Sequence, residues 1–312
     1  YHQLYRYYPD ILPTEYMEKI IGKVPGRVLA FLYILYFLYI GARVLRDFGS
    51  FLIIIFYTQM PLVIANALLI TVIIYAVRKG IEVLARTGEM LIALMYLLAI
   101  SGFILVLVSG LFQMNNLKPV LENGLMPVLK SAVTQTWYVP FGEAVVFAML
   151  LPYLNHPKRA KAAALSAIAL SGVNLTIVMA INMGVLGLDL VVRSLFPLLT
   201  TIQAINLTGF LNRLDVYFML ALILGGFFKI GIFIYAAVSG TATLFQVKKP
   251  VKLVLPFGFI VLVLSIIIAG DFGEHAKEGL ELVPLVVHLP FQVIIPTFLL
   301  VIAFLRNRKR KD

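Results

Sequence analysis

Apolar residues occur along the chain in runs of about twenty, separated by short polar segments. A helix rises about 1.5 Å per residue, so each run is long enough to cross the hydrocarbon core of a bilayer. The pattern therefore predicts an all-α polytopic membrane bundle within residues 28–305. The eight predicted spans are residues 28–57, 61–77, 91–112, 128–152, 163–187, 209–245, 253–270 and 284–305.

Three segments of the chain do not fit this pattern. Residues 1–27 are polar and turn-rich, and we expect a cytoplasmic segment there. Residues 188–208 are too short and interrupted to span, so we expect an outer-face helix or lid, with an ordinary long loop as the alternative. Residues 306–312 form a basic tail, which we place in the cytoplasm. The chain starts without Met or a signal-like segment, so we expect the gene product to begin earlier.

Composition and charge support a membrane protein. Hydrophobic residues make up 61% of the chain and charged residues 13%, with a mean hydropathy of +0.98. A soluble domain could not keep such a surface in water. Under the eight-span topology the basic loop residues lie almost all on one side, the exceptions being Lys118, Arg193 and Lys277. By the positive-inside rule, both ends are predicted to be cytoplasmic.

Several classes of function are disfavoured by the same composition. The net charge of +11 lies in short loops beside the spans, where it suits contact with the lipid bilayer and not with nucleic acid. There is no cysteine, and the four histidines have no metal-ligand spacing, so we expect no metal and no cofactor. We find no nucleophile–base pair, phosphate loop or carboxylate dyad, and we do not expect an enzyme.

One predicted span carries a helix breaker and a carboxylate at its centre. The stretch is "WYVPFGEAVVFAMLLPYL", from Trp137 to Leu154. Pro140 removes a backbone donor and Gly142 eases departure from helical geometry, so we expect a broken helix whose free ends bind a small ligand. A carboxylate at mid-membrane costs at least ~2.5 kcal/mol, so Glu143 should face the bundle interior. The alternative is a plain proline kink with Glu143 in a structural ion pair.

Further charges lie inside other predicted spans. Lys229 is about midway along 209–245 and could replace a bound cation, carry a proton, or pair with Glu143 or Asp47, functionally or only structurally. Arg43 and Asp47 lie four residues apart on one helix face, with Arg46 between them, so Arg43 and Asp47 can pair. The alternative to a functional role is an ion pair that only stabilises a gate. Nearer a span end, Arg213 and Asp215 are expected to cap their helix or form a salt bridge.

Five long motifs carry a resemblance to a known family. They are "ILPTEYMEKIIGKVPGR", "ILYFLYIGARVLRDF", "QTWYVPFGEAVVFAMLLPYL", "RSLFPLLTTI" and "LVPLVVHLPFQVIIP". Together they make the chain similar to the spore germination membrane proteins, the B subunits of nutrient germinant receptors, within the amino acid–polyamine–organocation transporter superfamily. The resemblance covers essentially the whole chain.

The resemblance implies a LeuT-like inverted-repeat transporter fold of ten helices, of which this chain supplies helices 3–10 and lacks the first two. It also implies that the span with Pro140 is the broken sixth helix and that helices 3 and 8 line the same ligand site. The predicted ligand-binding residues are Tyr138, Val139, Pro140, Phe141, Gly142, Glu143, Tyr33 and Tyr36. The predicted coupling or ion-site residues are Lys229, Glu143, Arg43 and Asp47.

Three functions remain open on this basis. The first is a nutrient sensor in the spore inner membrane that binds a small nutrient, an amino acid by preference, and signals to an A and a lipid-anchored C subunit, as the resemblance implies. The second is a proton-coupled amino acid transporter that uses the same site. The third is a scaffold or ion-conducting subunit whose pocket is vestigial.

Overall fold

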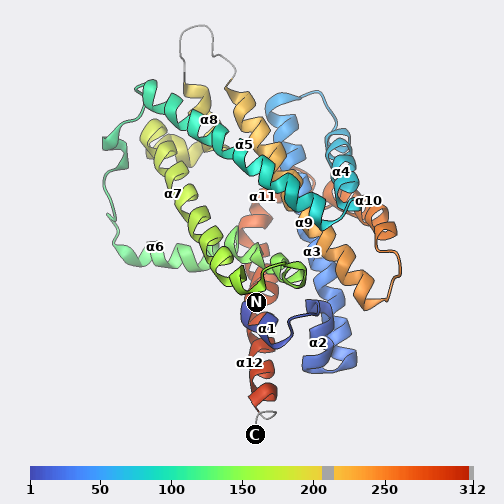
Figure 1. Ribbon diagram of the computed structural model, residues 1–312. Coiled ribbons are helices and arrows are strands. Elements are labelled where there is room, and N and C mark those ends of the chain that lie inside the picture. The colour runs from blue at the N-terminus through green and yellow to red at the C-terminus, as the bar shows by residue number, and fades with distance from the viewer. Residues whose placement is uncertain (206–213, 309–312) are drawn as a thin grey trace. The chain divides into compact units, whose positions relative to one another are not determined.

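The computed structural model describes residues 1–205 and 214–308. Every regular element in this part of the chain is helical. The contacts divide the chain into two compact units. The first unit comprises residues 1–84, 128–161 and 226–312, and the second comprises residues 85–127 and 162–225. Figure 1 labels the elements of both.

Helix α3, Lys23–Phe51, is the central element of the first unit. It follows α2, Pro13–Ile21, which starts with proline in its first turn and with the Glu15 carboxylate accepting the Leu12 N–H at 3.0 Å. Gly22 then turns the chain with a φ of 99°. At the crossing of the two helices, Gly26 lies directly against the backbone of α2, which no larger residue would permit.

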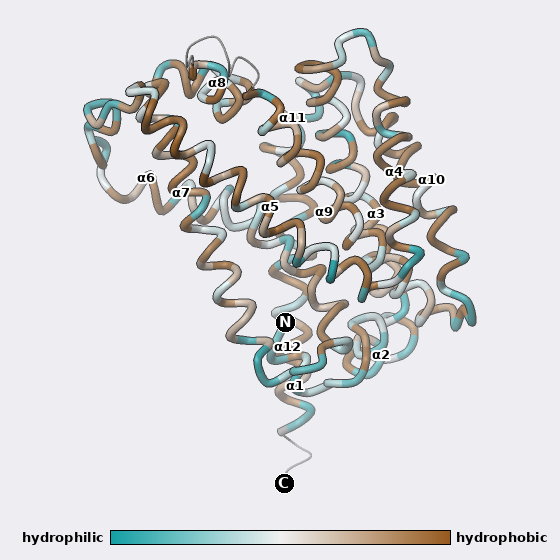
Figure 2. The backbone as a smooth tube through the Cα atoms, turned by 45° about the horizontal axis from the view of Figure 1, so that its top comes forward, coloured by the Kyte–Doolittle hydropathy of each residue, from teal (hydrophilic) through white to brown (hydrophobic). Residues whose placement is uncertain are grey.

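Two shorter apolar helices pack on α3, namely α4, Leu62–Arg78, and α10, Val251–Ile267. Figure 2 shows that the residues of both helices are mostly hydrophobic. A buried hydrogen bond of 2.9 Å joins the Asn66 amide of α4 to the Ser265 hydroxyl of α10. Because a buried amide must find partners in an apolar bundle, this bond fixes how the two helices align.

The end of α9, Asp215–Leu244, completes the core of the first unit. Its small and apolar residues, among them Ile230, Phe233 and Ala237, are almost completely buried. The Phe233 ring lies 6.1 Å from that of Phe37 on α3. This packing holds the α9 segment that carries Lys229 in the interior of the unit.

The first unit departs from α-helical geometry in several places, among them the π-helix η1, Leu52–Phe56, and the following three. The predicted span 128–152 consists of α6, Leu125–Ser131, then π-helix η3, Ala132–Thr136, a turn, and 3₁₀-helix η4, Phe141–Met149. The second is η7, Pro284–Ile294, a π-helix that runs into α12, Ile295–Arg308. The third is a bend of 101° between α10 and α11, Phe272–Glu281.

The second unit contains long helices with a small core of their own. It holds most of α5, Ile81–Val108, most of α7, Ala160–Arg193, and α8, Pro197–Ala204. Gly187, with a φ of 72°, interrupts α7. The core cluster consists of Val106, Ile181, Ile205 and Leu214. A buried bond of 2.9 Å between the Thr201 hydroxyl and Asn182 ties α8 to α7.

The helices confirm the predicted all-helical membrane class. By length and composition, five helices in the described part of the chain can cross a membrane, or six if the bent pair α10 and α11 forms one span. The eight-span topology stays a prediction, as does a lid role for α8 in the segment predicted at 188–208. Outside the described residues lie Arg213, the beginning of the span predicted from residue 209, and most of the basic tail.

Two buried glycines of α3 test the packing of α2 on α3. In Gly26→Ala the new methyl group would overlap the α2 backbone, so we expect a loss of about 1–3 kcal/mol in unfolding free energy. Gly41→Ala is the matched control, because a methyl group there would make ordinary contacts of 3.8 Å with Phe233 and Val261. Thermal unfolding in detergent measures both. Equal destabilisation by the two substitutions would contradict the close crossing.

Candidate functional site

The helix break predicted around Pro140 is present. Residues 137–140 form turns between the π-helix η3 and the 3₁₀-helix η4, so regular α-helical hydrogen bonding stops there. Proline supplies no N–H and its ring disfavours the preceding helical turn, which explains the position of the break. Neither flank of the break is a long α-helix, since α6 has only 7 residues and η4 is a 3₁₀-helix.

The first turn of η4 carries a buried ion pair. The Glu143 carboxylate lies 2.6 Å from the Lys229 ammonium of α9, a distance typical of a charge-assisted hydrogen bond. The Glu143 side chain is 11% exposed and that of Lys229 34%. Of the two partners considered for Lys229 in the sequence, Glu143 and Asp47, the structure pairs it with Glu143. Each charge compensates the other in a low-dielectric interior.

A network of neutral polar side chains lies within the same unit. The Gln292 amide donates to the Tyr36 hydroxyl at 2.9 Å and contacts His288 Nδ1 at 3.1 Å. The Tyr36 hydroxyl is itself 3.0 Å from His288 Nδ1. All three residues are at most 5% exposed. The network therefore joins α3 to the π-helix η7 through hydrogen bonds, and the Tyr36 ring also stacks on that of Phe291 at 4.8 Å.

Gly142 connects this network to the broken segment. A side chain at Gly142 would collide with the Gln292 amide oxygen, so glycine permits the close approach of η4 to η7. That oxygen is buried and has no hydrogen-bond partner. An unpaired buried acceptor costs about 1–3 kcal/mol, and a ligand donor could recover that cost. The broken segment, Gln292 and Tyr36 thus meet in one place.

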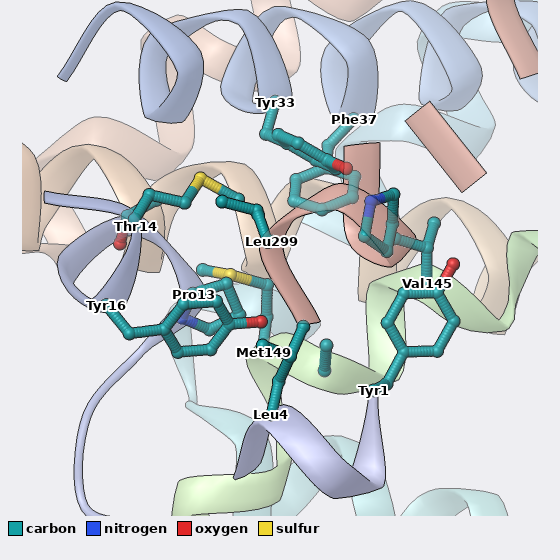
Figure 3. Close-up of a pocket in the computed structure, with 13 residues that line it drawn as sticks. Tyr1, Leu4, Pro13, Thr14, Tyr16, Tyr33, Phe37, Val145, Met149 and Leu299 are labelled. Atoms are coloured by element: carbon teal, nitrogen blue, oxygen red, sulfur yellow. The ribbon is translucent and has the colours of Figure 1, made fainter. Parts of the chain in front are cut away.

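Tyr33 belongs to the same region but faces a separate small cavity. Its hydroxyl donates to the Phe291 carbonyl oxygen at 2.7 Å. Figure 3 shows the cavity, which Tyr33 lines together with Tyr1, Tyr16 and other, mostly apolar residues. Its volume of about 20 Å³ suits a water molecule, not a nutrient. Burial raises the pKa of the Tyr1 and Tyr16 phenols, which therefore stay protonated at neutral pH.

Other predicted ligand residues are placed less favourably. Tyr138 is buried, but Val139 and Pro140 are exposed and Phe141 is half-buried. The structure brings Gly142 and Glu143 towards the polar groups of the first unit, whereas the residues before them form the turn. All eight predicted residues stay predictions as ligand contacts.

Sequence reasoning missed His288 and Gln292. The spacing of the histidines argues against a metal site but says nothing about a polar network. The sequence signal for such a network is the pair His288 and Gln292, two polar residues four apart inside an apolar run. The run is also punctuated by Pro284, Pro290 and Pro296. Prolines withhold backbone donors, and η7 adopts π-helical geometry, which often accompanies functional sites.

A second polar cluster lies where α3 meets α11. The Arg43 guanidinium donates to the His275 carbonyl oxygen at 2.6 Å and lies 3.6 Å from the Glu278 carboxylate. Asp47 contacts His275 Nε2 at 2.9 Å. The predicted pairing of Arg43 with Asp47 is therefore wrong, because α11 folds back and offers each a different partner. Gly279 makes room for the guanidinium, which a side chain there would crowd.

These features define a polytopic helical membrane protein with an interrupted segment, a buried ion pair and a polar network at one place in its core. The model of the spore germination protein family matches residues 1–272, and the chain belongs to that family. It is thus an integral membrane protein of a family not known for enzymes.

Among curated relatives, the chain is 53% identical to spore germination protein KB of Bacillus subtilis (strain 168), over 100% of this chain and 83% of the relative. It is 27% identical to spore germination protein YndE of the same strain, over 99% of this chain and 83% of the relative. No solved structure shows a significant match to the chain.

A double-mutant cycle tests the ion pair. Glu143→Leu leaves an unpaired ammonium and Lys229→Met an unpaired carboxylate, so we expect each to lower the unfolding free energy by about 3 kcal/mol. The double variant removes both charges and should lose less than the two single losses added together. Chemical or thermal unfolding in detergent gives the coupling energy. Additive losses would show that the two groups do not interact.

A second prediction concerns the attachment of α11. Arg43→Gln removes the bond to the His275 carbonyl and the contact with Glu278, so amides of residues 272–281 should exchange hydrogen at least about 10-fold faster. Exchange in the rest of α3 should change little. Lys277→Gln, an exposed position on α11, is the control. Unchanged exchange in α11 would mean that Arg43 does not hold it.

Proposed function

We propose that this family member is the membrane subunit of a spore nutrient germinant receptor and binds a small amino acid where η4 meets α9 and η7. The observation that carries the proposal is the Glu143–Lys229 ion pair beside a Gln292 acceptor that has no partner. The relative most similar among those described bears the name of a spore germination protein, which fits this role.

The chemistry of the ion pair favours a zwitterion. An amino acid carries an ammonium and a carboxylate close together, so inserting it between Glu143 and Lys229 replaces one ion pair by two. Its polar atoms would also reach the buried acceptor on Gln292 and the Tyr36 hydroxyl. A cation or an anion alone would leave one of the two protein charges unpaired, at a cost.

Signalling follows if the ligand separates the pair. The ion pair links η4 to α9, and the polar network links η7 to α3. A ligand that rearranges these links favours a different packing of the four elements, and its differential affinity sets the size of the shift. In this proposal the shift passes to the A and C subunits of a receptor in the spore inner membrane, with the C-terminus of this chain in the cytoplasm.

A proton-coupled amino acid transporter is the second candidate. The observation that favours it is the Glu143–Lys229 contact itself, because paired ionisable residues inside membrane spans commonly mark ion pathways and proton relays. Purified protein in vesicles separates the two functions. Amino acid uptake driven by a pH gradient indicates transport, and binding without flux indicates a sensor. A scaffold or ion-conducting subunit, the third candidate, would bind no nutrient.

Thermal stability against amino acids, sugars and nucleosides tests the proposal. A ligand present at 100 times its Kd should add about 2.7 kcal/mol to the unfolding free energy of the full-length protein. We expect one amino acid to raise Tm and Glu143→Gln to abolish that shift. Glu281→Gln, an exposed carboxylate on α11, should leave it intact.

Two results would contradict this function. If no compound in the panel raises Tm of the folded protein, the site does not bind a nutrient. If a sugar raises Tm and Glu143→Gln leaves the shift unchanged, the ligand does not bind the ion pair. Tyr36→Phe removes only one hydroxyl, so its effect on the shift would then show whether the ligand binds the network of Tyr36, His288 and Gln292 instead.

A further inference from the structure

A groove lies on the first unit between the beginning of α3 and the end of α9. It is lined by Arg27, Val28, Phe31, Leu244 and Phe245 and has a volume of about 290 Å³. The rings of Phe31 and Phe245 meet edge to face at 6.4 Å and are 44% and 59% exposed. Its wall is thus aromatic and aliphatic except for one guanidinium.

Two further basic residues follow the α9 end of this groove in the sequence. Lys248 and Lys249 follow Phe245 by three and four residues and are exposed. Their place is fixed by the turn that ends α9, in which the Val247 N–H donates to the Ala242 carbonyl at 2.9 Å and Gln246 takes a φ of 52°. The two lysines therefore come directly after the α9 end of the groove along the chain.

Few acidic residues offset this charge. The sequence holds none from residue 19 to 46 and none from residue 216 to 270. Glu18 pairs with Arg27, but through Nε at 3.1 Å, which is one edge of the guanidinium. The groove accordingly combines an apolar wall with basic residues, of which Arg27 is paired with Glu18, while neither Lys248 nor Lys249 forms an ion pair within the described part of the chain. An anion with an apolar tail fits both parts.

We propose that this groove binds an anionic phospholipid, with an acyl chain along Phe31 and Phe245 and the phosphate beside Arg27, Lys248 and Lys249. A membrane protein offers such a surface to lipid, and clusters of Lys and Arg beside a span attract anionic headgroups. Arginine and lysine both bind phosphate through charge-assisted hydrogen bonds. This inference does not depend on the nutrient site.

The test is thermal unfolding of the full-length protein in detergent with added long-chain phosphatidylglycerol. We expect phosphatidylglycerol to raise Tm, and neither phosphatidylcholine nor inorganic phosphate to do so. In Lys248→Gln/Lys249→Gln the half-saturating lipid concentration should rise about 25-fold, since each lysine near the surface contributes about fivefold. Both side chains are exposed, so this variant should fold.

The matched control removes two exposed charges elsewhere on the first unit, as Lys158→Gln/Lys161→Gln. We expect it to keep the response of the unaltered protein. An equal loss in the control would overturn the site in favour of general charge attraction. Equal stabilisation by phosphatidylcholine would show that the basic residues do not contribute to binding. Stabilisation by inorganic phosphate alone would show that the apolar wall does not contribute.

Discussion

The ion pair between Glu143 and Lys229 is the interaction on which the polar centre of the first unit depends. Neither charge could stay in an apolar bundle alone, because transferring an unpaired ion out of water costs several kcal/mol. The two come from elements far apart in the sequence, and their 2.6 Å contact fixes the position of the irregular segment. The geometry around Pro140 is therefore held by a charge on another helix.

Irregular backbone gathers near this pair. A 3₁₀-helix carries Glu143, and a π-helix carries His288 and Gln292. Inside a membrane such segments persist only where other protein groups satisfy their polar atoms. The side chains of Tyr36, His288 and Gln292 satisfy one another through hydrogen bonds. The Gln292 amide oxygen is the exception, because it is buried and has no hydrogen-bond partner.

The first unit holds two separate sets of polar contacts. Arg43 and Asp47 hold α11 against α3, while Glu143 and Tyr36 serve the polar centre. Arg43, Asp47 and Tyr36 all lie on α3, so this one helix contributes residues to both sets.

The sequence alone determined the class of protein, its apolar helices, the break at Pro140 and the interior charges, because hydropathy and proline act locally. It also indicated the family through long ordered motifs. Only the tertiary structure decided that Lys229 meets Glu143, that Arg43 and Asp47 turn to α11, and that His288 and Gln292 complete the network. Such choices depend on which segments distant in the sequence lie side by side, and spacing along one helix carries no information about that.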